Sequence, residues 1–99
     1  MGIVIAGQLI RESRAAILEI AARYGAHDVR IFGSVARGDA TEYSDLDLLV
    51  RFDGGRSLLD HGGLVMDLRD LLGIKVDVID EDAMQPRFRG EVLKEAIPL

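Results

Sequence analysis

Residues 33–50 read GSVARGDATEYSDLDLLV, and this stretch decides how the chain is built. Its second half runs into DLDLLVRF over residues 45–52, an apolar segment with two acidic residues at its start. Such a segment predicts a central β-strand, and the glycines that follow Asp53 supply the turn that ends it. Its first half opens with Gly33-Ser34 directly after residues 28–32, which contain Val29, Ile31 and Phe32 and predict a short strand, so a tight turn is expected at the end of that strand.

Two longer segments beside this stretch have the apolar spacing of helices. Residues 6–24 carry apolar side chains at helical intervals and are followed by a glycine, so they predict an amphipathic helix. Ser57 is a candidate N-cap for a second helix that runs through Leu72. Gly62 and Gly63 lie inside that helix and weaken it by roughly 1 kcal/mol each, which leaves room for a kink or for close packing.

The remaining segments complete an α/β (α+β) order. Residues 75–79, KVDVI, predict a third strand, and residues 81–96 predict a last helical stretch. A short helix is expected to begin near Ser34, and the polar residues 38–44 are expected to form a loop. We therefore expect a small mixed β-sheet of about three strands flanked by helices, with residues 1–99 forming a single domain.

The composition limits what the chain can do. Its 99 residues, 48% of them hydrophobic, suffice for one packed core but not for a second lobe that would hold another substrate. A net charge of −5, from 17 acidic and 12 basic residues, argues against direct nucleic-acid binding, which depends on neutralising phosphates. The absence of cysteine excludes disulfides, thiolate catalysis and cysteine-ligated zinc.

The N-terminal residues 1–7 are apolar but lack the basic lead and the long hydrophobic run of a signal peptide. No stretch of the sequence approaches the roughly 20 apolar residues of a membrane helix. We therefore expect a cytoplasmic protein that does not bind a membrane.

Asp45 and Asp47 stand one residue apart at the start of the central strand. Because side chains alternate across a strand, both carboxylates should lie on one sheet face, roughly 7 Å apart, while Leu46 points to the other face. Like charges on one face repel unless a cation lies between them, and carboxylate oxygens are ligands that Mg²⁺ prefers. The alternative interpretation is that the backbone and Arg51 or Lys75 satisfy these acids.

Three further positions extend the candidate site. Asp77, between two valines, would bring a third carboxylate to the same place if its strand neighbours the central one. A Gly-Ser pair after a strand is commonly an ordinary turn, but Gly33 would let a phosphate approach closely and Ser34 would add a hydroxyl donor. Arg37 could direct a guanidinium fork at the phosphate or hold the loop. The Walker-type loop is excluded, because its Gly-Lys-Ser/Thr run is missing.

The spacing joins these features into one pattern. Ten residues separate Gly33-Ser34 from Asp45-Leu46-Asp47, which places a phosphate cradle at the end of one strand and a metal site on the next. The segment GSVARGDATEYSDLDLLV, with KVDVI and the ending EVLKEAIPL, resembles the minimal nucleotidyltransferase (MNT) branch of the DNA polymerase β-type nucleotidyltransferase superfamily. The resemblance covers nearly the whole chain and implies the nucleotidyltransferase core of that superfamily.

The resemblance implies a role for each acidic residue. Asp45, Asp47 and Asp77 would be the catalytic and metal-binding residues, with Asp45 and Asp47 holding both of two Mg²⁺ ions. Asp77 would complete the site for the ion nearer the acceptor. The acceptor hydroxyl would lose its proton to Asp77 or to metal-bound water, and pyrophosphate would leave.

The resemblance also implies the nucleotide-binding residues and the partner. Gly33 and Ser34 would hold the β- and γ-phosphates, and Arg37 would support the triphosphate or the loop. The minimal branch resembles antitoxins encoded with HEPN-domain RNase toxins, and its active members transfer AMP from ATP to a tyrosine of the toxin. This implies an enzyme with ATP as substrate and a HEPN-domain toxin protein as partner and acceptor. No mechanistic role follows for the ending EVLKEAIPL.

Two other functions stay open. The chain could be a non-catalytic binding module that neutralises the toxin by occlusion, with the acidic site left as an inherited nucleotide pocket. It could also modify a small molecule, although it has no residues left to build the substrate domain that such relatives carry. The acceptor hydroxyl, the nucleotide base and the oligomeric state are left undetermined.

Overall fold

The computed structural model describes residues 5–40 and 45–99. In chain order these residues form α1 (Ile5–Arg23), β1 (Ala26–Phe32), α2 (Ser34–Arg37), β2 (Leu46–Phe52), α3 (Leu58–Leu72), β3 (Val76–Asp80), the 3₁₀ turn η2 (Glu81–Ala83), α4 (Pro86–Glu95) and β4 (Ile97–Pro98). The α/β class expected from the sequence is confirmed. The loop expected at 38–44 lies partly outside the described residues, because 41–44 are not among them.

The strands form one mixed sheet in the order β3-β2-β1-β4. β2 runs parallel to β3 and antiparallel to β1, and β1 is also antiparallel to β4. The expectation of about three strands therefore missed β4. That strand consists of Ile97 and Pro98 alone, and two residues carry no alternation from which a strand could be predicted.

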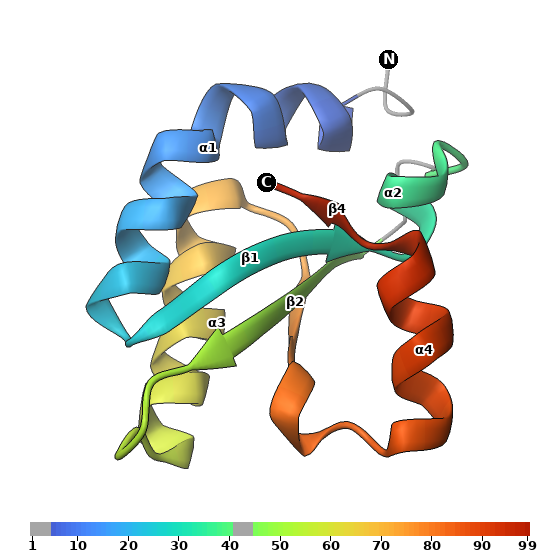
Figure 1. The fold of residues 1–99 in the computed structure, drawn as a ribbon. Coiled ribbons are helices and arrows are strands. Elements are labelled where there is room, and N and C mark those ends of the chain that lie inside the picture. The colour runs from blue at the N-terminus through green and yellow to red at the C-terminus, as the bar shows by residue number, and fades with distance from the viewer. Residues whose placement is uncertain (1–4, 41–44) are drawn as a thin grey trace.

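Helices α1 and α3 cover one face of the sheet and contact each other, whereas α4 stands apart from them on the other side of the strands (Figure 1). Along β2 and β3 the apolar residues of the covered face, Leu46, Leu48, Val50, Val76 and Val78, alternate with residues of the opposite face, which include Asp47 and Asp77 but also Leu49 and Ile79. The largest fully buried side chains are Ile17, Leu46, Leu48, Leu49, Leu64, Leu68, Val50 and Val76. The acidic residues are thereby left to the opposite face.

The helix expected from Ser57 to Leu72 is confirmed: Ser57 is its N-cap, and α3 continues through Gly62 and Gly63 without a break. The hydroxyl of Ser57 accepts from the Leu59 amide, and Asp60 closes a capping box. A Cβ on Gly63 would lie 2.5 Å from the ring of Tyr24, whereas one on Gly62 would meet nothing within 4 Å. Close packing therefore explains Gly63 but not Gly62.

Side chains of α3 cover the outer edge of β3. The amide of Leu46 donates to the Lys75 carbonyl at 3.0 Å, so the next outward-facing carbonyls are those of Val76 and Val78. Arg69 Nε and Nη2 donate to the Val76 carbonyl at 3.2 and 3.1 Å, and His61 Nε2 lies 2.7 Å from the Val78 carbonyl. Two of the acceptors that an edge strand would otherwise expose are thus occupied.

The helical stretch expected at 81–96 was wrong at its start. Residues 81–83 form η2, and α4 begins only at Pro86, which is a favoured first residue of a helix because its missing N–H is not needed there. No residue of α4 is buried. None of the described helices is long and apolar enough to span a membrane.

Candidate active site

The two strands that carry the acidic motifs are neighbours. Asp47 of β2 pairs with Asp77 of β3 in parallel register, and Phe32 of β1 pairs with Asp47 from the other side. Because directly opposite residues share a face, the carboxylates of Asp47 and Asp77 emerge side by side on the face that α1 and α3 leave free. The adjacency on which the placement of Asp77 depended is confirmed.

Asp45 lies just before β2, two residues from Asp47. Lys75 Nζ approaches Asp45 Oδ2 at 3.5 Å, and Arg69 Nη2 approaches Asp77 Oδ1 at 3.8 Å. The alternative interpretation was therefore correct about Lys75, which does contact an acidic residue of the motif. Arg51 instead contacts Asp82, at 3.4 Å, and takes no part in the site. Both cationic contacts are long and half-exposed, so they hold the acids only weakly.

Asp47 carries the electrostatic cost of this arrangement. Burial raises the pKa of the Asp47 carboxyl, and the nearby charges of Asp77 and Asp45 raise it further. The positive charge of Arg37 acts in the opposite direction, while Glu95 adds to the repulsion. A carboxylate disfavoured by its like-charged neighbours is one that a divalent cation would stabilise.

Gly33 brings the turn after β1 against this carboxylate. Its backbone has φ 76°, a conformation that favours glycine, and a Cβ there would lie 2.4 Å from Asp47 Oδ2. Ser34 follows as the first residue of α2 and is half-buried. The structure thus brings Gly33, Ser34 and Asp47 together, as the spacing of the motif predicted.

Glu95, the last residue of α4, reaches the same turn. Its Oε1 accepts from the Gly33 amide at 2.7 Å and from Arg37 Nη1 at 2.9 Å. Arg37 Nε also donates to Asp39, at 3.3 Å. The guanidinium of Arg37 therefore lies beside the turn and is held by two carboxylates, and the interpretation that it holds the loop agrees with these contacts.

The residues present fit Mg²⁺, although they do not enclose a cation as they stand. Within residues 5–40 and 45–99, no three carboxylate or imidazole side chains are already gathered as a metal-binding group. Asp45 and Asp77 are turned toward Lys75 and Arg69 instead. The donor set is nevertheless all oxygen, with Asp47 and Asp77 in register and mutually repelling, and hard divalent cations prefer such ligands.

An ion-pair cluster around one buried glutamate lies where β1, η2 and α4 meet. Glu81 is 5% exposed and contacts the guanidinium groups of both Arg30 and Arg89. Burial alone would raise the pKa of Glu81, but the hydrogen bonds from these arginines outweigh it, so the pKa lies below its usual value. The cluster joins β1 to α4 through η2 and so fixes the start of α4 on the sheet.

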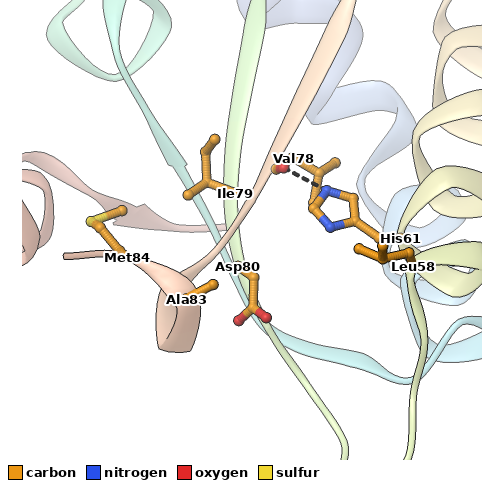
Figure 2. A pocket seen from close by; sticks show the side chains of 7 residues that line it. All are labelled: Leu58, His61, Val78, Ile79, Asp80, Ala83 and Met84. Carbon is orange, nitrogen blue, oxygen red and sulfur yellow. Dashed lines mark hydrogen bonds between the residues drawn. The ribbon is translucent and has the colours of Figure 1, made fainter.

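An apolar cavity of about 300 Å³ opens at the β3 edge, between the start of α3 and η2 (Figure 2). It is lined by Leu58, His61, Val78, Ile79, Asp80, Ala83 and Met84. None of the predicted site residues belongs to it, and its one carboxylate, Asp80, would repel a phosphate. The cavity therefore contributes nothing to the nucleotide site.

The sequence profile of the nucleotidyltransferase domain matches residues 14–99. The chain belongs to this family. Among relatives of this nucleotidyltransferase is a "putative protein adenylyltransferase" of Methanocaldococcus jannaschii, 39% identical over 88 residues that cover 89% of this chain and 95% of that protein. The protein adenylyltransferase MntA of Thermococcus cleftensis is 37% identical over 79 residues, 80% of each chain. The minimal branch to which the sequence was assigned is thus confirmed.

Solved structures share the fold of this nucleotidyltransferase. A "putative minimal nucleotidyltransferase" superposes with a TM-score of 0.86 at 52% identity and covers 100% of this chain and 97% of its own. A toxin–antitoxin structure with AMP-PNP superposes with a TM-score of 0.72 at 19% identity, over 83% of this chain and 68% of its own. The second likeness concerns the fold alone, and the first confirms the nucleotidyltransferase fold over the full described length.

Sequence reasoning missed Glu95 and Arg69. Glu95 meets Gly33 across 62 positions of sequence, so no local pattern could connect them. The ending EVLKEAIPL was noticed as similar to minimal nucleotidyltransferases, and the second of its two acidic residues is Glu95. Arg69 lies on the apolar helix α3, where nothing in the spacing distinguishes it from a surface residue.

Proposed function

We propose that this nucleotidyltransferase is an Mg²⁺-dependent protein adenylyltransferase that transfers AMP from ATP to a hydroxyl of a HEPN-domain RNase toxin. In this role it would act as the antitoxin. The observation that carries the proposal is the placement of Asp47 directly opposite Asp77, with Gly33 against the Asp47 carboxylate. This places the candidate metal ligands beside the candidate phosphate-binding turn.

The proposed roles follow from these positions. Asp45, Asp47 and Asp77 would hold two Mg²⁺ ions, which when bound would supply positive charge to the attacking and leaving oxygens. Gly33 and Ser34 would hold the β- and γ-phosphates, Gly33 by letting the turn come close to them and Ser34 through its hydroxyl, and Arg37 would support the turn. Asp77 would accept the proton of the acceptor hydroxyl. The hydroxyl oxygen then forms a bond to the α-phosphorus, and the bond between that phosphorus and pyrophosphate breaks.

The protein acceptor is supported by the kind of relative that the chain has. Two relatives at 39% and 37% identity are described as protein adenylyltransferases, and one solved neighbour is a toxin–antitoxin structure with AMP-PNP. Residues 5–40 and 45–99 form one small sheet with its helices, and these described residues include no second lobe that would hold a small-molecule acceptor. A partner protein could supply the acceptor hydroxyl itself and bring it to the acidic face, so that no such lobe would be needed.

The test combines the chain with ATP, Mg²⁺ and the protein encoded by the neighbouring gene. Intact-mass spectrometry should find the partner heavier by about 329 Da, the mass that an AMP group adds as a covalent modification. The double variant Asp45→Asn, Asp47→Asn should abolish the adduct. The matched control is Asp70→Asn, an exposed carboxylate of α3, which should leave the adduct intact.

The same variants separate catalysis from occlusion. If the double variant still suppresses the toxicity of the partner as well as the unchanged chain does, AMP transfer is not the means of control. The partner would then be neutralised by binding alone. A chain that forms no adduct on the intact partner under any nucleotide would overturn the proposed reaction.

A further inference from the structure

Glu95 is the one acidic side chain of α4 that reaches the phosphate-binding turn. A single oxygen, Oε1, accepts from the backbone amide of Gly33 at 2.7 Å and from Arg37 Nη1 at 2.9 Å. These two donors stand at the first residue of the turn and at the last residue of α2. One carboxylate oxygen thus ties the two ends of the segment together.

The turn needs such a constraint. Gly33 has φ 76° and ψ −154°, a backbone conformation that few residues adopt. Its amide hydrogen bond to Glu95 is part-buried, so losing the acceptor would leave a poorly solvated donor. Arg37 is gripped on a second side by Asp39, at 3.3 Å from Nε, and two acceptors on different nitrogens set the plane of its guanidinium.

The chain on both sides of Glu95 is itself held in place. Before it, Arg89 of α4 contacts the buried Glu81, which also contacts Arg30 of β1. After it, Ile97 of β4 pairs with β1. The backbone that carries the Glu95 side chain is therefore held on both sides, which limits how far its carboxylate can move away from the turn.

We propose that Glu95 is a positioning residue of the nucleotide site: it fixes the Gly33 amide and the Arg37 guanidinium in the arrangement that receives the triphosphate of ATP. This inference rests on the proposed function, because it assumes that the turn binds triphosphate. Glu95 acts through the turn and touches neither the nucleotide nor the acceptor. The opposite interpretation, a carboxylate that competes with phosphate for these donors, predicts a change of opposite sign when Glu95 is removed.

The experiment compares Glu95→Ala and Glu95→Gln with Glu91→Ala, which removes an exposed carboxylate from the same helix, paired only with Lys94 among its described contacts. Isothermal titration with ATP and Mg²⁺ should give a dissociation constant about tenfold higher for Glu95→Ala, as expected when a charged hydrogen-bond acceptor is lost. Glu95→Gln keeps an oxygen acceptor and should weaken binding less. Glu91→Ala should bind as the unchanged chain does.

A double-variant comparison separates positioning from a general effect on folding. On an Arg37→Ala background, Glu95→Ala should weaken ATP binding less than it does alone, because one of the two groups that Glu95 holds is already gone. NMR hydrogen exchange without nucleotide supplies a second measurement. The Gly33 amide should exchange faster in Glu95→Ala than in Glu91→Ala. Should Glu95→Ala fail to fold, Glu95→Gln takes its place in both measurements.

Each outcome decides a different claim. Unchanged or tighter ATP binding by Glu95→Ala overturns the positioning role, and tighter binding indicates competition instead. If the unchanged chain binds no ATP with Mg²⁺, the proposed function fails. The exchange of the Gly33 amide then decides alone whether Glu95 fixes the turn: faster exchange supports it, and unchanged exchange overturns it.

Discussion

Asp47 and Asp77 lie directly opposite one another on the parallel strands β2 and β3, at the place where Gly33 approaches the sheet. Like charges paired across neighbouring strands destabilise a sheet. The pair of Asp47 and Asp77 therefore lowers the stability of the fold when no ligand is bound. A function that needs converging carboxylates accounts for it, and the balance between stability and function can be measured.

Asp47→Asn should stabilise the protein in the absence of metal. The pKa of Asp47 is raised, first by burial and then by Asp77 and Asp45. The folded state therefore holds the proton more tightly than the unfolded state, and the stability this provides is complete below the ordinary aspartate pKa and lost as pH rises through the raised one. At pH 7 in EDTA the variant should gain up to about 1 kcal/mol in urea denaturation. If Asp47→Asn loses as much stability with rising pH as the unchanged chain does, Asp47 is not the source of that loss and the prediction is wrong.

Mg²⁺ should stabilise the unchanged chain but not the double variant Asp45→Asn, Asp47→Asn. A cation that binds only the folded state adds roughly 1.4 kcal/mol to the free energy of unfolding at ten times its dissociation constant. Thermal melts with and without Mg²⁺ should show the gain, and EDTA should remove it. If Mg²⁺ stabilises the double variant Asp45→Asn, Asp47→Asn by the same amount, the ion binds at another site.

Gly33→Ala should damage both stability and nucleotide binding. Its Cβ would meet Asp47 Oδ2 at 2.4 Å, and its φ of 76° is strained for alanine. Gly38→Ala is a control for positive φ, because φ is 81° there, but its αL backbone with ψ 13° is less strained than that of Gly33 with ψ −154°, and nothing lies within 4 Å of the added carbon. We expect Gly38→Ala to cost about 1 kcal/mol from backbone strain alone and Gly33→Ala to cost clearly more. Equal costs in chemical denaturation would show that the contact with Asp47 has no influence.

Gly62→Ala and Gly63→Ala should change stability in opposite directions although the two glycines are adjacent. Gly62 has open space around it, so alanine should stabilise α3 by about 1 kcal/mol through helix propensity. At Gly63 the added carbon would lie 2.5 Å from Tyr24 Cε1 and would displace a ring whose hydroxyl donates to Asp67 at 2.6 Å. Gly63→Ala should therefore destabilise, and urea midpoints of the two variants on opposite sides of the unchanged chain would bear this out.

The sequence was most informative where physical periodicity is local. The strand period predicted that Asp45 and Asp47 share a face, although β2 begins only at Leu46, and the Gly33-Ser34 turn was predicted from its position after the strand that ends at Phe32. The helix from Ser57 was predictable because its capping chemistry is contained in four residues.

The prediction failed where structure depends on distant partners. The pairing of Asp77 with Asp47 had to be assumed, since nothing in either strand specifies its neighbour. β4 forms because Ile97 pairs with Ile31 of β1, which lies far away in the sequence. α4 begins later than predicted, because Asp80 caps the 3₁₀ turn η2, which occupies residues 81–83. The contact of Glu95 with Gly33 belongs to the same class.

The side-chain cover over the edge of β3 limits how another protein can recognise this one. Arg69 and His61 already occupy the outward carbonyls of Val76 and Val78, and at the opposite edge β4 offers only two residues. Adding a strand beside β3 would therefore require displacing these groups, and adding one beside β4 would mean pairing with a very short template. A partner protein would more readily bind this chain through contacts with the side chains of the acidic face. Its specificity would then follow the surface chemistry of that face and would not arise from generic backbone pairing.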